Sequence, residues 1–353
     1  MVEISSIVQE DLEDIGKRLG ADVALFSGAT VIVSGGCGFL GRYIVGALLE
    51  LNKLFPNNPC KVVVLDNYIT SSRKNLIFDE SGPNYTFIEC DVRSPIPESI
   101  NADYVIHAAG LASPFYYRKF PIETIEVAVN GTKNFLEYAR ERPVKGMIFY
   151  SSSEIYGDPP PQMIPTPETY WGNISCLGPR ACYDESKRLG ETLCNVYQSL
   201  YGVPVKIIRP FNVYGPGGLA DQDFRAIPTF ISAGLAGKKM PVHGKGNQTR
   251  TFCYITDAVV GFLKVLLRGK SGEAYNIGHD QDEMNMMTLA HTIAGMIGGE
   301  ASAELIDYPD TYPAGEPQRR CPDLSKARSE LGFIPSVDLQ NGLKRTIEWY
   351  RAL

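Results

Sequence analysis

Residues 30–52 read TVIVSGGCGFLGRYIVGALLELN, and this stretch decides the fold. The apolar run from Thr30 to Val33 predicts a short buried strand, and the apolar residues from Arg42 to Leu51 recur with the period of a helix. Between them, residues 34–41 form a glycine-rich turn, which allows a pyrophosphate to bind close to the backbone at the N-terminus of the helix. Glycines alone are weak evidence, but the flanking strand and helix predict a dinucleotide-binding turn. The expected contacts are Gly35, Gly38, Phe39, Leu40 and Gly41.

A second predicted strand ends on an acidic residue. Residues 61–65 are mostly apolar and lead into Asp66 and Asn67. An acid about 20 residues after such a turn binds the adenosine ribose of NAD, and its charge repels the 2′-phosphate of NADP. Asp66 therefore favours NAD, although an acid at this position can also simply begin a turn. Arg73 and Lys74 in the following loop keep NADP open as an alternative.

Strand and helix signals then alternate along the chain. Strands are predicted at 84–91, 104–109, 145–150 and 205–208, and helices at 122–140 and from Tyr183 through Leu200. This alternation predicts an α/β protein with a Rossmann-type, doubly wound parallel sheet that binds ligands at the carboxyl ends of its strands. These strand ends add four expected cofactor contacts, Asp91, Val92, Ala108 and Ala109. His107 lies inside an apolar run, and we expect a core histidine satisfied by the backbone rather than a catalytic one.

Three regions are expected along the chain. Residues 1–28 form an N-terminal helical extension, with a helix between Gln9 and Leu19 that caps the core in preference to touching a partner subunit. Residues 29–208 form the NAD-binding domain. Residues 209–353 mainly form a smaller, interleaved substrate-binding region, with helices at 226–236, 258–267 and 289–297, and about 250–279 return to the NAD-binding domain. The proline-rich piece at 159–167 is expected to be an active-site loop.

The composition is that of a soluble globular protein. The 353 residues carry a net charge of −6, so neither nucleic acid nor an anionic membrane is an expected partner. No apolar run reaches the roughly 18 residues that a transmembrane helix needs. The eight cysteines include no CxxC pair, so neither a disulfide framework nor a metal site is expected. The expected location is the cytoplasm.

The stretch from Ser151 to Lys187 holds the candidate catalytic residues. It opens with SSSE directly after a predicted strand and closes with Tyr183 and Lys187, which share one face of a helix. A phenol titrates near 10, and a neighbouring ammonium and a nicotinamide cation would lower that pKa. Tyr183 is therefore a candidate base for a hydroxyl proton as hydride leaves to NAD.

Several motifs together point to one family. The chain resembles the extended short-chain dehydrogenase/reductases, which include nucleotide-sugar epimerases, dehydratases and decarboxylases, in SGGCGFLG at 34–41, HAA at 107–109, NGT at 130–132, SSSEIYG at 151–157, YDESK at 183–187, RPFNVYGP at 209–216, TRTFCYITD at 249–257 and YNIG at 275–278. The resemblance covers the chain from about Thr30 to the C-terminus. It implies an NAD cofactor, a nucleotide-sugar substrate, and a homodimer formed by the helices around Asn130 and Tyr183.

Within that family, the chain most resembles the UDP-glucuronate decarboxylases, in EIYGDP at 154–159, ETYWGN at 168–173, GPRACYDESKR at 178–188, GNQTRTF at 246–252 and PQRRCPD at 317–323. The resemblance implies decarboxylation of UDP-glucuronate to UDP-xylose through a 4-keto intermediate. It makes Tyr183 the base and Lys187 the residue that lowers its pKa and binds the nicotinamide ribose. It places Ser152, Ser153 and Glu154 at the reacting end of the sugar, with a serine at 152 where the family usually has threonine.

The resemblance also assigns the rest of the substrate site. Arg320 would face the glucuronate carboxylate, with the adjacent Arg319 as its competitor and a surface arginine as the alternative. The remaining expected substrate contacts are Ser113 and Tyr117 in the segment LASPFYY, Asn212, Arg225 and Arg250 at phosphate or ribose, and His243 near the uracil. Arginine suits a diphosphate by its geometry, although Arg225 and Arg250 can also be read as solvated charges.

Three alternatives stay open. A nucleotide-hexose 4,6-dehydratase begins with the same oxidation, but its pattern places an aspartate directly before the glutamate, where this chain has Ser153. A 4-epimerase usually lacks the glutamate, which is present here as Glu154. A non-catalytic NAD-binding regulator belongs to another class, and the intact Tyr183, Lys187 and Glu154 argue against it.

Overall fold

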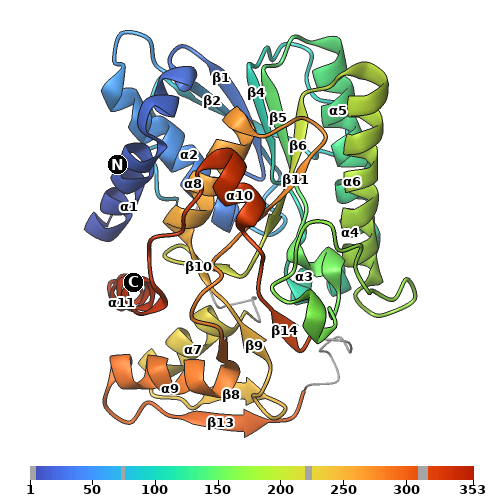
Figure 1. Ribbon diagram of the computed structural model, residues 1–353. Coiled ribbons are helices and arrows are strands. Elements are labelled where there is room, and N and C mark those ends of the chain that lie inside the picture. Colours follow the sequence, from blue (N-terminus) through green and yellow to red (C-terminus); the bar gives the residue numbers. More distant parts are fainter. Residues whose placement is uncertain (1–4, 73–75, 219–224, 309–316) are drawn as a thin grey trace.

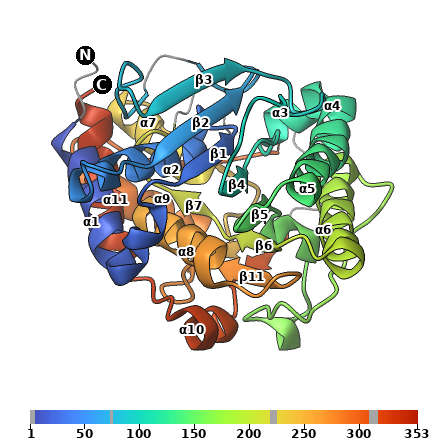
Figure 2. The same cartoon turned by 90° about the horizontal axis from the view of Figure 1, so that it is seen from above.

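A parallel sheet forms the centre of the fold (Figures 1 and 2). The computed structural model describes residues 5–72, 76–218, 225–308 and 317–353. Within them, seven parallel strands pair in the order β11-β6-β5-β4-β1-β2-β3. The strands are β1 Thr30–Ser34, β2 Lys61–Asp66, β3 Tyr85–Glu89, β4 Tyr104–His107, β5 Gly146–Tyr150, β6 Val205–Pro210 and β11 Ala274–Ile277. Strand order runs outward in both directions from the neighbours β1 and β4, which confirms the predicted doubly wound sheet and puts its switch point between them.

Helices cover both faces of this sheet (Figure 2). One face carries α2 (Phe39–Leu51) and α8 (Ile255–Arg268), and the other carries α5 (Thr132–Glu141) and α6 (Ala181–Tyr201). The side chains of β1 alternate between the two cores, with Val31 and Val33 in one and Ile32 in the other. A strand buried on both faces is apolar throughout, which explains the run that predicted it.

The long helix predicted at 122–140 is interrupted. It divides into α4 (Pro121–Glu126), a π-helical turn (Val127–Gly131) and α5. The preceding α3 (Pro114–Lys119) was not predicted. The fourth strand stops at His107, two residues before the predicted end, because Ala108 and Ala109 turn past the carboxyl edge of the sheet.

The second region lies below the sheet in Figure 1. It contains α7 (Ala226–Leu235) and α9 (Met286–Ile297), which pack together and against the parallel pair β8 (Met240–His243) and β13 (Ala303–Ile306). Short strands connect this region to the sheet: β7 Val213–Tyr214, β9 Thr249–Arg250, β10 Cys253–Tyr254, β12 Met284–Asn285 and β14 Arg319–Arg320. Two further helices, α10 (Ser325–Leu331) and α11 (Leu339–Arg351), were not predicted.

The N-terminal extension folds onto the sheet domain. Its helix α1 (Ser6–Leu19) contacts α2 and α8, and it begins earlier than the predicted Gln9 because the side chain of Ser5 accepts a hydrogen bond from the N–H of Val8. The predicted helix is thus confirmed. Its apolar face, formed by Val8, Leu12, Ile15 and Leu19, is buried, and each such side chain contributes roughly 1.5–3 kcal/mol as an upper estimate.

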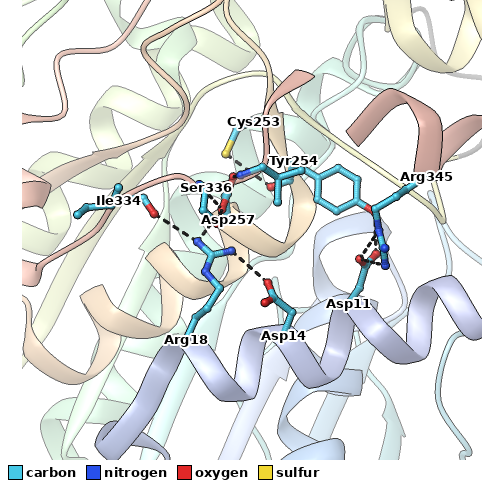
Figure 3. A network of polar contacts seen from close by, with 10 residues as sticks. Asp11, Asp14, Arg18, Cys253, Tyr254, Asp257, Ile334, Ser336 and Arg345 are labelled. Carbon is cyan, nitrogen blue, oxygen red and sulfur yellow. Dashed lines mark hydrogen bonds and ion pairs between the residues drawn. The ribbon is translucent and has the colours of Figure 1, made fainter. Parts of the chain in front are cut away.

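Polar contacts fasten the same helix to distant parts of the chain (Figure 3). The buried carboxylate of Asp11 accepts hydrogen bonds from the hydroxyls of Tyr43 (3.0 Å) and Tyr254 (2.8 Å) and from Nη2 of Arg345 (2.9 Å). About two turns further on, Arg18 lies 2.6 Å from the buried Asp257. Burial raises the pKa of Asp11 to about 6, against the opposing effect of Arg345. Helix α1 is therefore tied to α2, to the start of α8 and to the last helix, α11.

No helix among the residues described is both long enough and apolar enough to span a bilayer.

Candidate active site

The glycine-rich turn fits the N-terminus of α2 against the carboxyl edge of the sheet. Gly35 has a φ of +68°, and a Cβ there would lie 2.8 Å from the Cα of Ala109. A Cβ on Gly41 would lie 2.0 Å from the carbonyl oxygen of Gly35. The N–H of Cys37 donates to Oδ2 of Asp66 at 3.0 Å, which fixes the turn to the end of β2. The glycines are therefore required by two close backbone approaches.

A cavity of about 430 Å³ opens beside this turn. Its lining includes all the residues of the turn and strand ends at which a cofactor was expected: Gly35, Gly38, Phe39, Leu40, Gly41, Asp66, Asn67, Asp91, Val92, Ala108 and Ala109. Its volume lies in the usual range for small-molecule sites. Asp66 also begins a turn, since its Oδ1 accepts the N–H of Tyr68 at 2.8 Å. Its contact with a ribose stays a prediction, and its place in the lining of the cavity is compatible with it. Arg73 and Lys74 lie outside the described residues.

A second cavity, of about 310 Å³, adjoins the first. The two share Leu40, Ala108, Gly110, Ala112 and Arg225 in their linings. The second cavity is lined by most of the residues expected at the substrate or in catalysis: Ser152, Ser153, Glu154, Tyr183, Lys187, Asn212, Arg225, His243, Arg250 and Arg320. Ser113 instead lines the first cavity. Tyr117 is buried, and its ring stacks on that of Tyr183 with centroids 5.4 Å apart.

Tyr183 and Lys187 both lie on α6 at the junction with β5. Nζ of Lys187 donates to the carbonyl oxygen of Tyr150 at 2.7 Å and lies 5.8 Å from the centre of the Tyr183 ring. Burial lowers the pKa of Lys187 to about 8. Burial also raises the pKa of Tyr183, and a hydrogen bond with the side chain of Ser152 opposes that rise. The predicted lowering of this pKa depends on a nicotinamide cation as well as on Lys187 and stays a prediction, and in the protein alone desolvation dominates.

Glu154 lies between two arginines. Nη2 of Arg320 and Nη2 of Arg180 both contact its Oε2. Arg319, the alternative to Arg320, points elsewhere and forms a two-pronged pair with Glu283 at 2.6 and 2.7 Å. Arg180 was not predicted as a site residue. An arginine directly before a helix is a usable signal, because the positive end of the helix dipole disfavours a cation there unless an acid compensates it.

The proline-rich loop holds the segment that carries Arg320. The N–H of Thr166 donates to the carbonyl of Cys321 at 2.8 Å, and the carbonyl of Thr166 accepts the N–H of Asp323 at 3.0 Å. Oδ1 of Asp158 accepts the N–H of Gln318 at 2.8 Å. The loop therefore supports the active site through the segment that carries Arg320.

A buried polar network supports the short helix that carries Glu154. The hydroxyl of Tyr156 donates to Oδ1 of Asn276 at 2.8 Å and accepts from Nη1 of Arg209 at 2.7 Å. Arg209 in turn forms a fork with the carboxylate of Glu191 at 2.9 and 2.6 Å. These contacts fix the short 3₁₀ helix Ser153–Tyr156 between β6, β11 and α6.

The far end of the second cavity suits a nucleotide. The rings of His243 and Tyr308 stack nearly parallel with centroids 5.4 Å apart, and Tyr308 was not predicted as a site residue. Nη2 of Arg250 donates to the carbonyl of Pro317 at 2.7 Å. Strand β9 pairs with β14, which places Arg250 opposite Arg320. Nδ2 of Asn212, which has a φ of +40°, donates to the carbonyl of Thr251 at 2.8 Å.

His107 is a core residue, although not in the predicted way. It is buried, and its Nδ1 lies 2.8 Å from the hydroxyl oxygen of Ser34 on the neighbouring strand. The expected backbone partner is therefore wrong, because the register of β1 and β4 places Ser34 directly opposite. Burial lowers the pKa of His107 to about 3, so its ring is neutral at physiological pH.

Comparisons with known proteins agree with this geometry. The family model described as the NAD-dependent epimerase/dehydratase family matches residues 31–278. The chain is 38% identical over 322 residues to UDP-glucuronic acid decarboxylase 3 of Arabidopsis thaliana, which covers 91% of this chain and 89% of the relative. Among solved structures, an epimerase of Methanothermobacter thermautotrophicus superposes with a TM-score of 0.82 at 27% identity and covers 95% of both chains. The dTDP-glucose 4,6-dehydratase of Streptomyces venezuelae, solved with NAD bound, superposes with a TM-score of 0.79 at 27% identity over 92% of this chain and 97% of that one. The sheet, the glycine-rich turn and these matches show that the chain belongs to the NAD-dependent epimerase/dehydratase family.

Proposed function

We propose that this protein is an NAD-dependent enzyme that decarboxylates UDP-glucuronate to UDP-xylose. The observation that carries the proposal is Arg320, a buried cation in the same cavity as Tyr183, Lys187 and Glu154. A buried arginine in a sugar site suits a substrate that brings a carboxylate. The relatives named as UDP-glucuronic acid decarboxylases support the same substrate.

The residues around the first cavity fit NAD. The Gly35–Gly41 turn leaves room beside the start of α2 for a pyrophosphate, and Asp66 offers a carboxylate oxygen to a ribose diol. Lys187 lines the second cavity, and its Nζ would lie 3.2 Å from a Cβ on Gly110, which lines both cavities; from there it would bind the nicotinamide ribose. When bound, NAD supplies a hydride acceptor for C4 of the sugar and returns the hydride at the end of the turnover.

Tyr183 is the base in the first step. It takes the proton of the C4 hydroxyl, and the hydrogen bond from Ser152 stabilises the phenolate that forms. Because burial raises the pKa of the phenol in the protein alone, the phenolate needs further positive charge. Lys187, 5.8 Å from the ring centre, supplies part of it.

Arg320 and Glu154 act at the other end of the sugar. Oxidation at C4 makes the C5 carboxylate part of a β-keto acid, and Arg320 holds that carboxylate as a fork. The bond between C5 and the carboxylate breaks, carbon dioxide leaves, and the electron pair remains as an enolate that Ser152 and nearby donors stabilise. A proton then adds to C5, delivered by Glu154 or by a water that Glu154 orients. Tyr183 returns its proton to the C4 oxygen.

The nucleotide fills the remaining part of the second cavity. Asn212, Arg225 and Arg250 contact phosphate or ribose, and His243 with its stacked neighbour Tyr308 receives the base. Ser113 and Tyr117 stand near the sugar, the second of them through its contact with Tyr183.

A 4,6-dehydratase or a 4-epimerase acting on another nucleotide sugar is the second candidate. Both kinds of enzyme are structural neighbours of this chain, so the fold does not separate them. Ser153 stands where a dehydratase of this pattern has a second carboxylate, and Glu154 stands where an epimerase usually has none. These two residues favour decarboxylation. Lack of turnover with every nucleotide sugar offered would instead favour a non-catalytic NAD-binding regulator.

We also infer a homodimer and a cytoplasmic location. Exposed apolar side chains gather on α4 and α6, namely Ile122, Ile125, Leu189, Val196 and Leu200, and a second copy would cover them. Light scattering coupled to size-exclusion chromatography tests the dimer. All eight cysteines are unpaired, which suits a reducing compartment.

We keep the division into an extension at 1–28, an NAD-binding domain at 29–208, and a substrate region at 209–353 from which about 250–279 return to the sheet. The packing of α8 and β11 on the sheet domain supports the last point.

One experiment tests the activity. Purified protein is incubated separately with UDP-glucuronate, UDP-glucose and dTDP-glucose, and the products are identified by mass and NMR. We expect carbon dioxide and UDP-xylose from UDP-glucuronate and no product from the two hexoses. A 4-keto-6-deoxy sugar from either hexose would overturn the proposal in favour of a dehydratase.

A further inference from the structure

Two buried guanidinium groups meet at one carboxylate oxygen. Arg180, which precedes α6, and Arg320, in β14, both contact Oε2 of Glu154, and both are less than one-tenth exposed. Charges removed from water need close partners, and here two buried guanidinium groups share one carboxylate oxygen. A carboxylate of the substrate would give Arg320 a partner that it does not share with Arg180.

The two arginines are held in different ways. Nε of Arg180 lies 3.7 Å from Oδ2 of Asp184, so its guanidinium has an anchor other than Glu154. Nε of Arg320 is buried and, among the described residues, finds no hydrogen-bond partner. An unsatisfied buried N–H is unfavourable. Nε and Nη2 form one edge of a guanidinium, and a carboxylate can occupy both as a fork. Glu154 uses only Nη2, so Arg320 is the one prepared to receive a new carboxylate.

Arg180 also connects the acid to the base. Its carbonyl oxygen accepts the N–H groups of Tyr183 at 2.9 Å and of Asp184 at 3.0 Å in the first turn of α6. The residue that contacts Glu154 with its side chain therefore starts the helix that carries Tyr183. The helix dipole disfavours a cation at the N-terminus of a helix. The contacts of the Arg180 guanidinium with Glu154 and Asp184 compensate for this.

We propose that Arg180 is a positioning residue that holds Glu154 when Arg320 leaves Glu154 for the carboxylate of the substrate. The proposal rests on UDP-glucuronate as the substrate. With Arg180 present, each arginine pairs with one carboxylate. Without it, Arg320 is the only cation among the described residues that contacts the Glu154 carboxylate, and the carboxylate of the sugar must compete for it. The affinity for a carboxylate-bearing sugar then falls, while the affinity for a sugar without a carboxylate does not.

The test compares two ligands that differ at this group. Binding of UDP-glucuronate and of UDP-glucose is measured by calorimetry for wild type and Arg180→Ala, together with kcat and KM for carbon dioxide release. We expect UDP-glucuronate affinity to fall by about tenfold or more and UDP-glucose affinity to change by less than about threefold. Arg180→Lys should recover part of the loss, because it restores the charge without the fork. Arg319→Ala, which removes the neighbouring exposed arginine, should leave both affinities unchanged.

A double-mutant cycle separates positioning from a general structural effect. Because Arg180 acts through Glu154, Arg180→Ala should add less than about twofold to the loss of UDP-glucuronate affinity already caused by Glu154→Gln. Additive losses would overturn the proposal, as would equal losses for the two ligands. If Arg180→Ala does not fold, as judged by its melting temperature and NAD content, Arg180→Lys and Arg180→Gln are compared in the same way.

The outcome also distinguishes the two proposals. A wild type that binds UDP-glucuronate but releases no carbon dioxide overturns the proposed activity, and the binding comparison still decides the role of Arg180. A wild type that decarboxylates, with an Arg180→Ala variant that retains its preference for the carboxylate, overturns only the role of Arg180.

Discussion

Replacement of Asp11 by asparagine should change how the stability of the protein depends on pH. Asp11 is buried in α1 between Tyr43, Tyr254 and Arg345, and burial raises its pKa from 3.8 to about 6. Between these two values the folded protein binds a proton at Asp11 that the unfolded chain has lost. The contribution of Asp11 to the free energy of unfolding therefore falls as the pH rises through this window. Asparagine does not titrate, so Asp11→Asn lacks this slope.

The magnitude follows from the two pKa values. Integration of the linkage relation gives wild type about 1.3 kcal/mol more stabilisation from Asp11 at pH 5 than at pH 7. The free energy of unfolding of Asp11→Asn, relative to wild type, should therefore be higher at pH 7 than at pH 5 by about 1.3 kcal/mol. Other titrating groups contribute to both proteins and cancel in this comparison.

Urea unfolding followed by circular dichroism at the two pH values measures this difference. Asp14→Asn is the matched control, because Asp14 lies on the same helix with a half-exposed side chain and pairs with Arg18 at 3.3 Å. The control should shift stability by a similar small amount at both pH values. A difference between Asp11→Asn and wild type that is independent of pH, or that has the opposite sign, would refute the reasoning.

Three further predictions concern the site. Tyr183→Phe removes the proton acceptor and should lower kcat by about 10²- to 10⁴-fold while the purified protein retains its NAD; near-normal turnover would contradict the assignment. Arg320→Ala should weaken UDP-glucuronate binding far more than UDP binding in calorimetry, and equal losses would argue against a carboxylate contact. In Gly41→Ala the new Cβ would lie 2.0 Å from the carbonyl oxygen of Gly35, so the turn must open and the cofactor extracted from the protein should fall well below one per chain; full occupancy would show that the turn adapts.

The sheet and the cofactor turn could be predicted because their determinants are local. An apolar run such as residues 30–33 sets a buried strand, and the glycines at 35 and 41 are required by backbone approaches within or beside the turn. The acid at the end of β2 lies at a fixed distance along the chain from that turn. Each of these features is visible without knowledge of the neighbouring strands.

The missed features depend on contacts between distant segments. Arg180 meets Glu154 across 26 residues and Arg320 meets it across 166, so no spacing along the chain reveals the triad. The partner of His107 is Ser34, 73 residues away, and only the register of β1 and β4 identifies it. The sequence also does not display the burial of Tyr183, which raises its pKa in the protein alone and opposes the lowering predicted from Lys187 and a nicotinamide cation.

Helix α11 was not predicted either, although its pattern is local. Leu339, Leu343 and Ile347 recur at helical spacing and are buried, so a signal was present and was not used. The π-helical turn at Val127–Gly131 was also not predicted, since π-helical turns are rare and occur mostly as single turns within α-helices.

The short ladder between β9 and β14 has a consequence for how this scaffold can evolve. Arg250, assigned to the nucleotide, sits opposite Arg320, assigned to the sugar carboxylate, and its guanidinium holds the carbonyl of Pro317 just before Arg320. A substitution at 250 that suits another nucleotide thus also displaces the strand that presents residue 320. Changes at the proposed phosphate or ribose contact and at the proposed sugar contact are therefore expected to be epistatic, and a lineage that changes one must readjust the other before either works well.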